Sequence, residues 1–465
     1  MGWKKYLFVF VLVGLLVTDC NFPATMTQAQ GFLTVTPTAF SPYSSSNSSP
    51  QPILFTPGPT SISRNWPPPI FGTPGPTQVT PLPSPATAIN PPGSINVLLA
   101  ASDRATPSFR TDTLILVSFQ PEYDQVTLLS IPRDLYVYIP GWQMQRINAA
   151  YYRGQTTAYP GGGPGLLKDT ILYNLGIEVD RVALVDFDGF VNIIDSLGGL
   201  DVPVSCKYTD WKIINPRRDP EDEDNWRLFT LDPGVVHMDG DLAFWYARSR
   251  KRSSDFDRGR RQQEVLRALY SQSLRLNTLR NAPEIFRELH DSLTTDVDLA
   301  FILEMLPFAT RIRSAQVRSF YINRDVLISW RTPQGAAVLL PDESKLPEFL
   351  SKVFAPSREI VTTNPLVEIR KGTDNEDWPE LAEARLNYAG FEVFISNTES
   401  QPVSQTKVIG LSQKTDQAEI DTLMASLGLS ATRFEHAPQP GASAEYRLIL
   451  GEDYNPCFDP SKLEG

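Results

Sequence analysis

The chain has 465 residues, of which 41% are hydrophobic and 20% charged, and its formal net charge is −11. This length predicts two or more domains with real cores, at about 100–200 residues each, and the negative charge argues against a nucleic-acid partner. Three cysteines (Cys20, Cys206 and Cys457) are too few for a disulfide scaffold, and three scattered histidines argue against a zinc site or a histidine-based triad.

The N-terminal segment, residues 1–20, has the pattern of a signal peptide or membrane anchor. Two lysines precede an apolar run from Tyr6 to Val17, which is shorter than the about 20 residues that a membrane span needs. Cys20 follows at the position of a lipoprotein cysteine, but Asp19 stands where a small residue is usual. Lipidation and an uncleaved anchor both remain open. In either case we expect an extracytoplasmic protein tethered to the cell membrane through its N-terminus.

Residues 21–93 form a Pro/Ser/Thr-rich tract that holds 17 of the 40 prolines and a single charged residue, Arg64. A segment of this composition cannot bury a core, so we expect a disordered linker with polyproline II character. Fully extended at about 3.1 Å per residue, it would reach roughly 200 Å from the membrane.

Residues 94–350 alternate short apolar runs with amphipathic stretches, which predicts an α/β domain with a layered mixed sheet and flanking helices. The expected strands are Ile95–Ala101, Asp112–Phe119, Val126–Ile131, Arg181–Phe187 and Val317–Ile322. The expected helices are Pro164–Leu175, Asp188–Leu197 with Asp188 as its N-cap, Gln262–Leu279, Ala282–Ser292 and Asp298–Thr310.

Residues 365–455 repeat the alternation on a smaller scale and predict a separate small α/β domain with an accessory or binding role. The expected strands are Leu366–Arg370, Phe391–Ser396, Thr406–Gly410 and Glu445–Leu450, and the expected helices are Trp378–Ala389 and Gln417–Leu427. Cys206 and Cys457 would be free to pair across the two domains outside the cytoplasm, although two lone cysteines do not establish a bond.

Between Arg248 and Gln263 the chain carries seven basic residues in sixteen, together with Asp255 and Asp257. Like charges repel, so this crowding in an acidic chain indicates an anionic ligand, and arginine forks match phosphate oxygens well. A solvated basic loop is the alternative. Arginine and aspartate also occur together at or just beyond strand ends, where α/β sheets bind ligands. These groups are Asp103-Arg104, Arg110 with Asp112, and Arg133-Asp134.

Seven motifs in a fixed order resemble the LytR-CpsA-Psr family over about residues 95–330. They are Asn96–Arg104, Arg110–Thr113, Ser130–Asp134, Arg146–Tyr151, Val185–Gly189, Tyr246–Arg250 and Asp255–Arg258 with Arg261–Gln263. Residues 365–455 resemble the C-terminal domain that often accompanies this family. The resemblance implies an extracytoplasmic phosphotransferase that moves a glycopolymer from an undecaprenyl-pyrophosphate carrier to peptidoglycan through a phosphodiester link.

The same resemblance implies the roles of individual residues. Asp103 and Asp112 would bind a divalent metal, Mg²⁺ or Mn²⁺. Catalytic roles fall to Arg110, Arg133 and Asp255, which would orient the set of arginines. Apart from the resemblance, Asp134 is a candidate base on chemical grounds, because a carboxylate can accept the proton of the attacking hydroxyl. The polyprenyl-pyrophosphate-linked glycan would be held by Arg110, Arg133, Arg146, Arg248, Arg250, Arg258, Arg261 and Gln262. Arg146 stands where the family commonly has lysine, and Asp257 where many members have glycine. Lys251, Arg252 and Arg260 are expected to be solvated.

The residues leave other functions open. A lipid pyrophosphatase or phosphoesterase would pass the same intermediate to water, and a non-catalytic envelope protein would use the basic cluster to hold anionic polymers. Six apolar residues, Leu184, Phe187, Phe190, Ile193, Ile194 and Leu197, either line a groove for the polyprenyl chain or form ordinary core, because their spacing fits both.

Overall fold

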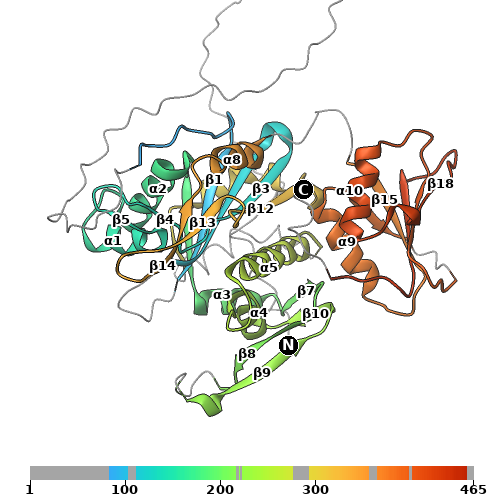
Figure 1. The fold of residues 1–465 in the computed structure, drawn as a ribbon, viewed down its shortest axis with the longest axis horizontal. Coiled ribbons are helices and arrows are strands. Elements are labelled where there is room, and N and C mark those ends of the chain that lie inside the picture. Colours follow the sequence, from blue (N-terminus) through green and yellow to red (C-terminus); the bar gives the residue numbers. More distant parts are fainter. Residues whose placement is uncertain are drawn as a thin grey trace, which may run out of the picture.

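The structure, a computed structural model, describes residues 83–102, 111–215, 219, 222–275, 293–355, 364–396 and 401–457 (Figure 1). The predicted leader 1–20, most of the predicted linker and the expected helix Ala282–Ser292 lie outside these residues. Within them, no helix is both long and apolar enough to cross a membrane.

The last part of the predicted linker belongs to the fold. The Ala86 and Ile89 amides donate to carbonyls at the end of a helix, Tyr173 at 2.7 Å and Gly176 at 3.0 Å. The Tyr173 hydroxyl donates to the Pro83 carbonyl at 2.7 Å. These contacts correct the boundary at residue 93. Prolines and polar residues suit a strap whose backbone bonds to a neighbouring element as well as they suit a linker.

A six-stranded mixed sheet forms the centre of the first domain, with the order β11-β6-β1-β2-β3-β12. The strands are β1 (Ile95–Ser102), β2 (Thr111–Gln120), β3 (Gln125–Ser130), β6 (Arg181–Asp186), β11 (Leu293–Thr295) and β12 (Val317–Tyr321). The layered α/β fold expected from the sequence is confirmed. The strands read as nearly continuous apolar runs because helices cover both faces of the sheet.

Alternate strand residues separate into two cores. On one face Val97, Leu99 and Val117 pack with α3 (Phe187–Ser196), α4 (Gly240–Arg248), α5 (Asp255–Arg275) and α7 (Leu299–Ala309). On the other face Leu98 and Leu116 pack with α1 (Ala150–Thr156), α2 (Gly162–Leu175) and α8 (Leu346–Phe354). Burial of both faces fixes the register of the strands, since a shift by one residue would exchange the two cores.

Two helix starts differ from the sequence expectation. Helix α3 is capped by Asp186, whose carboxylate accepts from the Gly189 amide, and not by Asp188, which lies in the first turn. Both aspartates suit a helix start, and the strand β6 ends one residue earlier than expected. Helix α5 begins at Asp255, seven residues before the expected Gln262, because its first turns are basic and lack the apolar periodicity used to predict helices.

Several short strands lie beyond the sheet and were not expected. They are β4 (Tyr136–Tyr138) with β5 (Met144–Arg146), β7 (Leu200–Val204) with β10 (Gly234–Met238), β8 (Tyr208–Ile213) with β9 (Trp226–Leu231), and β13 (Leu327–Arg331) with β14 (Ala337–Pro341). The β8–β9 hairpin forms the lower lobe in Figure 1, below α4 and α5.

The second domain has a five-stranded sheet with the order β16-β15-β19-β17-β18. Its elements are β15 (Leu366–Lys371), α9 (Trp378–Tyr388), β16 (Glu392–Ile395), β17 (Lys407–Gly410), α10 (Gln417–Leu427), β18 (Phe434–His436) and β19 (Tyr446–Leu450). Its buried Glu368 carboxylate accepts from Arg370 Nε at 2.7 Å and Arg447 Nε at 2.6 Å.

The two domains are joined covalently by the Cys206–Cys457 disulfide, which closes a sequence separation of 251 residues. Helix α9 faces β7, β10 and β12 of the first domain. The Val235 amide donates to Asp377 Oδ2 at 3.2 Å beside this contact. The disulfide that the sequence left open is therefore present in the structure.

Candidate functional site

Four strands of the central sheet run in one direction and end at the same edge. They are β1, β3, β6 and β12, as shown by the parallel pairing of β1 with β6 and of β3 with β12 and by the antiparallel position of β2. Strand β2 starts at this edge, where Thr111 pairs with Ser102. Ligands in α/β sheets bind outside the carboxyl ends of strands, so this edge is the expected place for a site.

A small pocket of about 30 Å³ opens at this edge, between the strand ends and the start of α5. Its lining includes four residues predicted from the sequence: Asp112, Arg133, Arg258 and Gln262. The remaining lining residues are Thr113, Leu114, Ser130, Ile131, Pro132, Phe256, Gly259, Tyr321 and Ile322. Segments that are more than 100 residues apart in the chain thus meet here.

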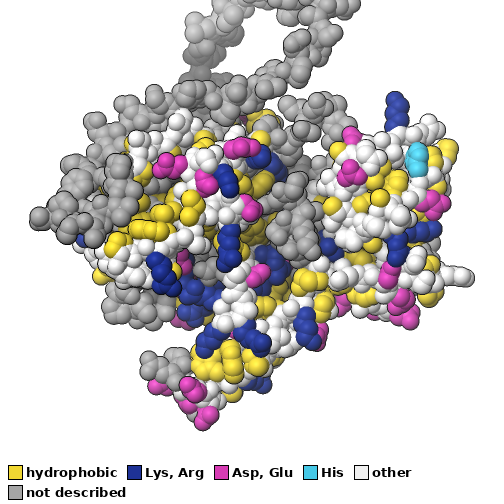
Figure 2. Space-filling view, viewed as in Figure 1, with side chains coloured by type: hydrophobic (Ala, Val, Ile, Leu, Met, Phe, Trp, Pro, Cys, Tyr) yellow, Lys and Arg dark blue, Asp and Glu magenta, His cyan; other side chains and the backbone are white. Residues whose placement is uncertain are grey.

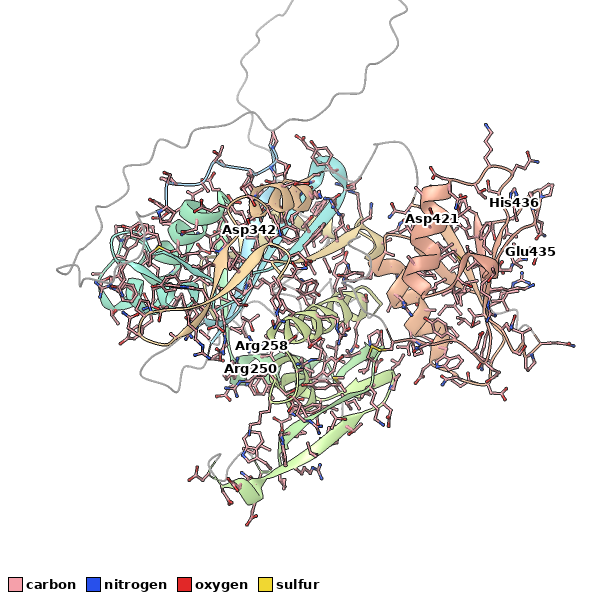
Figure 3. All side chains as sticks on the ribbon, in the orientation of Figure 1. Arg250, Arg258, Asp342, Asp421, Glu435 and His436 are labelled. Carbon is pink, nitrogen blue, oxygen red and sulfur yellow. A yellow bond between two sulfur atoms is a disulfide. The ribbon has the colours of Figure 1, made fainter. Side chains whose placement is uncertain are left out.

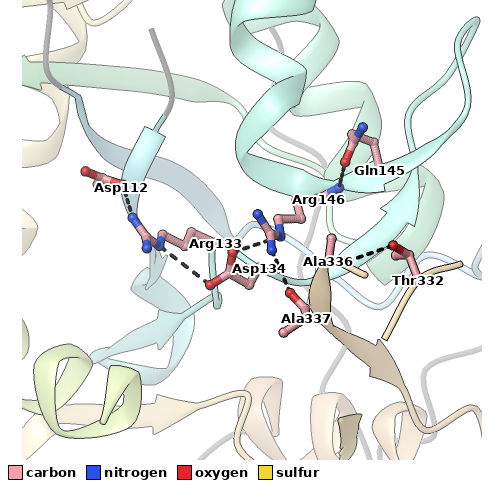
Figure 4. Close-up of polar contacts among 8 residues, drawn as sticks. All are labelled: Asp112, Arg133, Asp134, Gln145, Arg146, Thr332, Ala336 and Ala337. Carbon is pink, nitrogen blue, oxygen red and sulfur yellow. Dashed lines mark hydrogen bonds and ion pairs between the residues drawn. The ribbon is translucent and has the colours of Figure 1, made fainter. Parts of the chain in front are cut away.

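Alternating charges line one side of the site (Figure 4). Arg133 donates to Asp112 and lies 3.7 Å from Asp134 Oδ2, and Arg146 Nε lies 3.1 Å from Asp134 Oδ1. Arg146 also donates to the Ala337 carbonyl at 2.7 Å. Each arginine is thereby held in place by carboxylates. Both oxygens of Asp134 face arginines, so a role as base would require it to give up one of these contacts.

The opposite side of the site comes from α5 and the end of α4. Gln262 Nε2 donates to Thr113 Oγ1 at 2.8 Å and to the Ala247 carbonyl at 3.2 Å, which ties α5 to β2 and α4. Gly259 on the same helix faces the Tyr321 ring, which a Cβ at this position would meet at 3.4 Å, an ordinary van der Waals distance. Tyr321 comes from β12, and no sequence signal connected it with the site.

Arg261 does not line this pocket but lies in the core behind it. Its guanidinium is fully buried and donates to the carbonyls of Tyr246 and Ser249 and to Ser253 Oγ, and it stacks 4.1 Å from the Tyr208 ring centre. These contacts fix the α4–α5 junction (residues 249–254), which carries the other basic residues. The structure gives Arg261 a positioning role where the sequence predicted contact with the phosphates.

The basic residues at the end of α4 and in the junction are exposed. Arg248 and Arg250 are exposed, and Arg248 lies 4.5 Å from the Phe187 ring centre. Figure 3 labels Arg250 and Arg258, and Figure 2 shows Lys and Arg side chains gathered in this part of the face. Lys251 and Arg252 are exposed as predicted. Their neighbourhood presents a cationic surface beside the pocket.

Arg260 corrects the prediction of a solvated side chain. It is largely buried and donates to Glu264, one helical turn away. The Glu264 carboxylate also accepts from the Tyr246 hydroxyl at 2.7 Å. Burial opposes the charge on Arg260, but Glu264 outweighs it and raises the arginine pKa, so this cation is held in an ion pair and not offered to solvent.

Asp257, whose role the sequence left in doubt, is the third residue of α5 and bonds reciprocally with Ser254, which precedes the helix and accepts from the Asp257 amide at 3.1 Å. Its carboxylate accepts from the amide of Ser254 at 3.0 Å and from the hydroxyl of Ser254 at 2.7 Å. Burial opposes ionisation, but these hydrogen bonds and the nearby arginines outweigh it and lower the pKa of Asp257. An anionic group at a helix start is favourable, and here it also orders the junction.

The apolar residues suggested for a lipid groove belong mostly to the core. Leu184, Ile193, Ile194 and Leu197 are buried in the two clusters that flank the sheet. A separate apolar cavity of about 30 Å³ lies between the sheet and α5 and is lined by Leu99, Val117, Phe119, Val126, Leu128, Leu266, Arg267, Tyr270 and Val317. A larger cavity of about 750 Å³ lies between the two domains, with Arg260, Glu264 and Tyr321 in its wall.

Three predicted site groups lie outside the described structure: Asp103, Arg110 and the side chain of Asp255. Among the described residues, no group of three or more His, Cys, Asp or Glu side chains is placed to hold a metal ion. The Asp112 carboxylate suits Mg²⁺ or Mn²⁺ as an oxygen donor, and Asp103 follows Ser102, the partner of Thr111. The donor chemistry therefore fits a divalent metal, and the ligand set stays a prediction.

Comparison with known proteins identifies the family of this chain. A family model described as LytR_cpsA_psr family matches residues 78–354. The polyisoprenyl-teichoic acid–peptidoglycan teichoic acid transferase TagU of Oceanobacillus iheyensis is 31% identical over 209 residues, which are 44% of this chain and 60% of TagU. Regulatory protein MsrR of Staphylococcus aureus is 30% identical over 207 residues, 44% of this chain and 57% of MsrR. The chain thus spans about 60% of these relatives' length.

Solved structures are also similar to part of this chain. The crystal structure of TagV from Bacillus subtilis has 26% sequence identity and a TM-score of 0.44, and the match covers 56% of this chain and 97% of TagV. The LytR-CPS2A-psr family protein YwtF (TagT) with bound octaprenyl pyrophosphate lipid has 26% identity and a TM-score of 0.40, with 56% of this chain and 88% of that protein covered.

Proposed function

Because the chain belongs to the LytR-CpsA-Psr family, we propose that it is an extracytoplasmic phosphotransferase of the cell envelope. It would transfer a glycopolymer from a polyprenyl-pyrophosphate carrier, undecaprenyl pyrophosphate by the family resemblance, to peptidoglycan. Three relatives of this chain are named as transferases of teichoic acid to peptidoglycan, which supports the reaction class. The polymer that this chain carries is not specified by those names.

The pocket at the sheet edge carries the proposal. Arg133 and Arg258 approach it from different elements, and Arg248 and Arg250 lie on the adjacent surface. A pyrophosphate diester bears about two negative charges, and an arginine 4 Å from one of them contributes at most about 4 kcal/mol at an effective dielectric constant of 20. Phosphoryl transfer depends mainly on positioning and charge neutralisation, which this arrangement of arginines supplies.

In the proposed reaction a sugar hydroxyl of the acceptor attacks the phosphorus atom that carries the glycan. A new P–O bond forms, the P–O bond to the second phosphate breaks with its electron pair, and polyprenyl phosphate leaves. Arg133 and Arg258 would hold the phosphates, and Arg146 would hold Asp134 in place. The hydroxyl proton passes to a base, for which Asp134 is the candidate. Arg110 and Asp255 keep the catalytic roles that the family resemblance implies for them.

A divalent metal would be held by Asp112 together with Asp103, and would lower the negative charge on the phosphates when bound. Arg133 donates to Asp112 in the structure, so the same carboxylate would serve both partners. Arg133 would then lie between Asp112, the metal ligand, and Asp134. The cations of the site would lie along one wall that carries these carboxylates.

The function is tested with the full chain, a lipid-pyrophosphate-linked glycan, Mg²⁺ and a peptidoglycan acceptor. Release of lipid monophosphate only when acceptor is present supports transfer. Release without acceptor would assign a pyrophosphatase instead. No release in either case, with Arg133→Ala losing only polymer binding, would leave a non-catalytic envelope-binding protein. Membrane tethering through residues 1–20 is tested separately, by fractionation of cells that express the full chain.

A further inference from the structure

The β8–β9 hairpin has one face with no charged side chain. In the register Trp211 lies opposite Leu228, Ile213 opposite Trp226, and Thr209 opposite Thr230. Because side chains alternate along a strand, these six point to the same side of the hairpin, and the other side carries Tyr208, Asp210, Lys212, Arg227, Phe229 and Leu231. The second face packs on the domain through Tyr208 and Phe229, whose rings contact Trp245.

The uncharged face is open to solvent. On this face Leu228 is 49% exposed and Trp211 38%, whereas Ile214, which is 53% exposed, falls on the other side by the same alternation. Half of the six exposed large apolar side chains in the described residues therefore lie on this hairpin, and the other three are scattered on separate elements. Single exposed apolar residues are ordinary, but a group of them with tryptophan at a projecting edge marks an interaction surface.

Cations border this apolar face. Lys251 Nζ lies 3.6 Å from the Trp226 ring centre, and the next residue, Arg252, is exposed. Both residues belong to the α4–α5 junction, in which Arg248 and Arg250 are also exposed. Figure 2 shows apolar side chains on the lower lobe with Lys and Arg beside them. An apolar, tryptophan-bearing surface with adjacent Lys and Arg fits the boundary of an anionic bilayer.

We propose that the β8–β9 hairpin docks on an anionic lipid surface, with Trp211 and Leu228 entering the headgroup boundary and the junction cations facing the lipid phosphates. The hairpin is fixed to the candidate site, because the Tyr208 hydroxyl lies 2.9 Å from Ser249 Oγ and Trp245 Nε1 donates to the Trp211 carbonyl at 2.8 Å. Docking would therefore bring the pocket to the membrane surface. The proposal does not depend on the reaction proposed above.

A glycan is the other macromolecule that could stack on tryptophan. Apart from the two tryptophans, the uncharged face has few groups that would bind a glycan. Its other side chains are aliphatic or threonine, and the face carries no side-chain amide or carboxylate. Four described residues at the hairpin tip, Asp219, Asp222, Glu223 and Asp224, carry the wrong charge for an anionic membrane and should oppose docking. Their replacement by Gln and Asn should therefore strengthen it.

Hydroxyl-radical footprinting tests the proposal on the full chain, inserted into vesicles of phosphatidylcholine alone or mixed equally with phosphatidylglycerol. Tyr152 is the internal control, because it is 38% exposed like Trp211 but lies on α1. On mixed vesicles we expect oxidation of Trp211 to fall by about fivefold, because a ring that enters the boundary leaves water, while oxidation of Tyr152 is unchanged. Phosphatidylcholine alone should protect Trp211 less.

Charge reversal separates this docking from tethering by the N-terminus. Lys251→Glu with Arg252→Glu should abolish the protection of Trp211, since each basic residue near an anionic surface is worth about fivefold in binding. Lys352→Glu on α8 is the matched control, and this variant should retain the protection of Trp211. Equal protection of Trp211 and Tyr152, protection of neither, insensitivity to the double reversal, or protection of Trp211 by soluble glycan strands without lipid would each overturn the proposal. None of these outcomes requires turnover.

Discussion

Replacement of Arg133 by glutamine tests the central arrangement of the site. This arginine is mostly buried and bridges Asp112 and Asp134, so its charge is held at the pocket by two carboxylates. In the variant Asp134 keeps its ion pair with Arg146, whereas Asp112 loses the partner that neutralises it. A ligand phosphate would then meet one cation fewer and one anion more.

The expected loss can be worked from these contacts. At an effective dielectric constant of 20, the attraction between Arg133 and a phosphate about 4 Å away is about 4 kcal/mol as an upper bound, and solvent at the open pocket reduces it. We expect a loss of about 2–4 kcal/mol in binding of a polyprenyl pyrophosphate, which is about 30- to 700-fold in Kd. Arg133→Lys keeps the charge but not the planar fork, so it should lose about 1–2 kcal/mol.

Isothermal titration with a short, soluble polyprenyl pyrophosphate measures these losses. Arg311→Gln is the matched control, because Arg311 is 59% exposed and pairs with Asp124 at 3.4 Å on the surface, where such a pair is worth about 0–1 kcal/mol. Thermal melting of each variant confirms that it is folded. If Arg133→Gln binds within twofold of the wild type, or if Arg311→Gln weakens binding equally, the pocket is not the pyrophosphate site.

Three further predictions concern the metal, the second domain and the disulfide. Asp112→Asn should abolish the response of lipid-phosphate release to added Mg²⁺, whereas Asp124→Asn should keep it; equal responses would argue against Asp112 as a metal ligand. Burial opposes ionisation of Glu368, but its two arginine partners outweigh it and lower its pKa from 4.5. Its stabilising effect is therefore complete above about pH 4.5 and is lost as the pH falls through the lowered pKa. Glu368→Gln should lower the free energy of unfolding by about 3 kcal/mol at neutral pH and flatten its decline in acid, as urea titrations between pH 3 and 7 would measure. Cys206→Ser with Cys457→Ser should cost about 2–4 kcal/mol in non-reducing urea titrations and make stability insensitive to dithiothreitol; an unchanged midpoint would show that the bond adds nothing to the interface.

Elements with strong periodicity were predictable from the sequence. Helix α10 has the predicted bounds, and the five expected strands of the first sheet occur within two residues of their predicted ends. The β8–β9 hairpin was not predicted, because strand residues of both faces are mixed with charges and its turn is a long polar segment and not a short Asn-Gly type. Sheet order was not predictable either, since it depends on which strands pack together across the helices.

The clustering of four predicted residues was predictable from the sequence, but their contacts were not. Asp112, Arg133, Arg258 and Gln262 line one pocket, as expected for polar groups that follow strand ends. The ion pair between Asp112 and Arg133 was not expected, because residues 21 apart in sequence give no local signal of contact. Tyr321 was missed for the same reason, since it enters from the last strand of the sheet.

Helical periodicity explains why the basic cluster is not a single patch. Arg258 and Gln262 are four residues apart on α5 and both line the pocket, whereas Arg261 lies in the core and Arg260 pairs with Glu264 beside the interdomain cavity. Charges that are adjacent in the sequence therefore face three different environments, which relieves their mutual repulsion. The same helix borders the pocket on one side and the interdomain cavity on another. A shift of the second domain against α5 would therefore change the positions of Arg258 and Gln262 in the pocket.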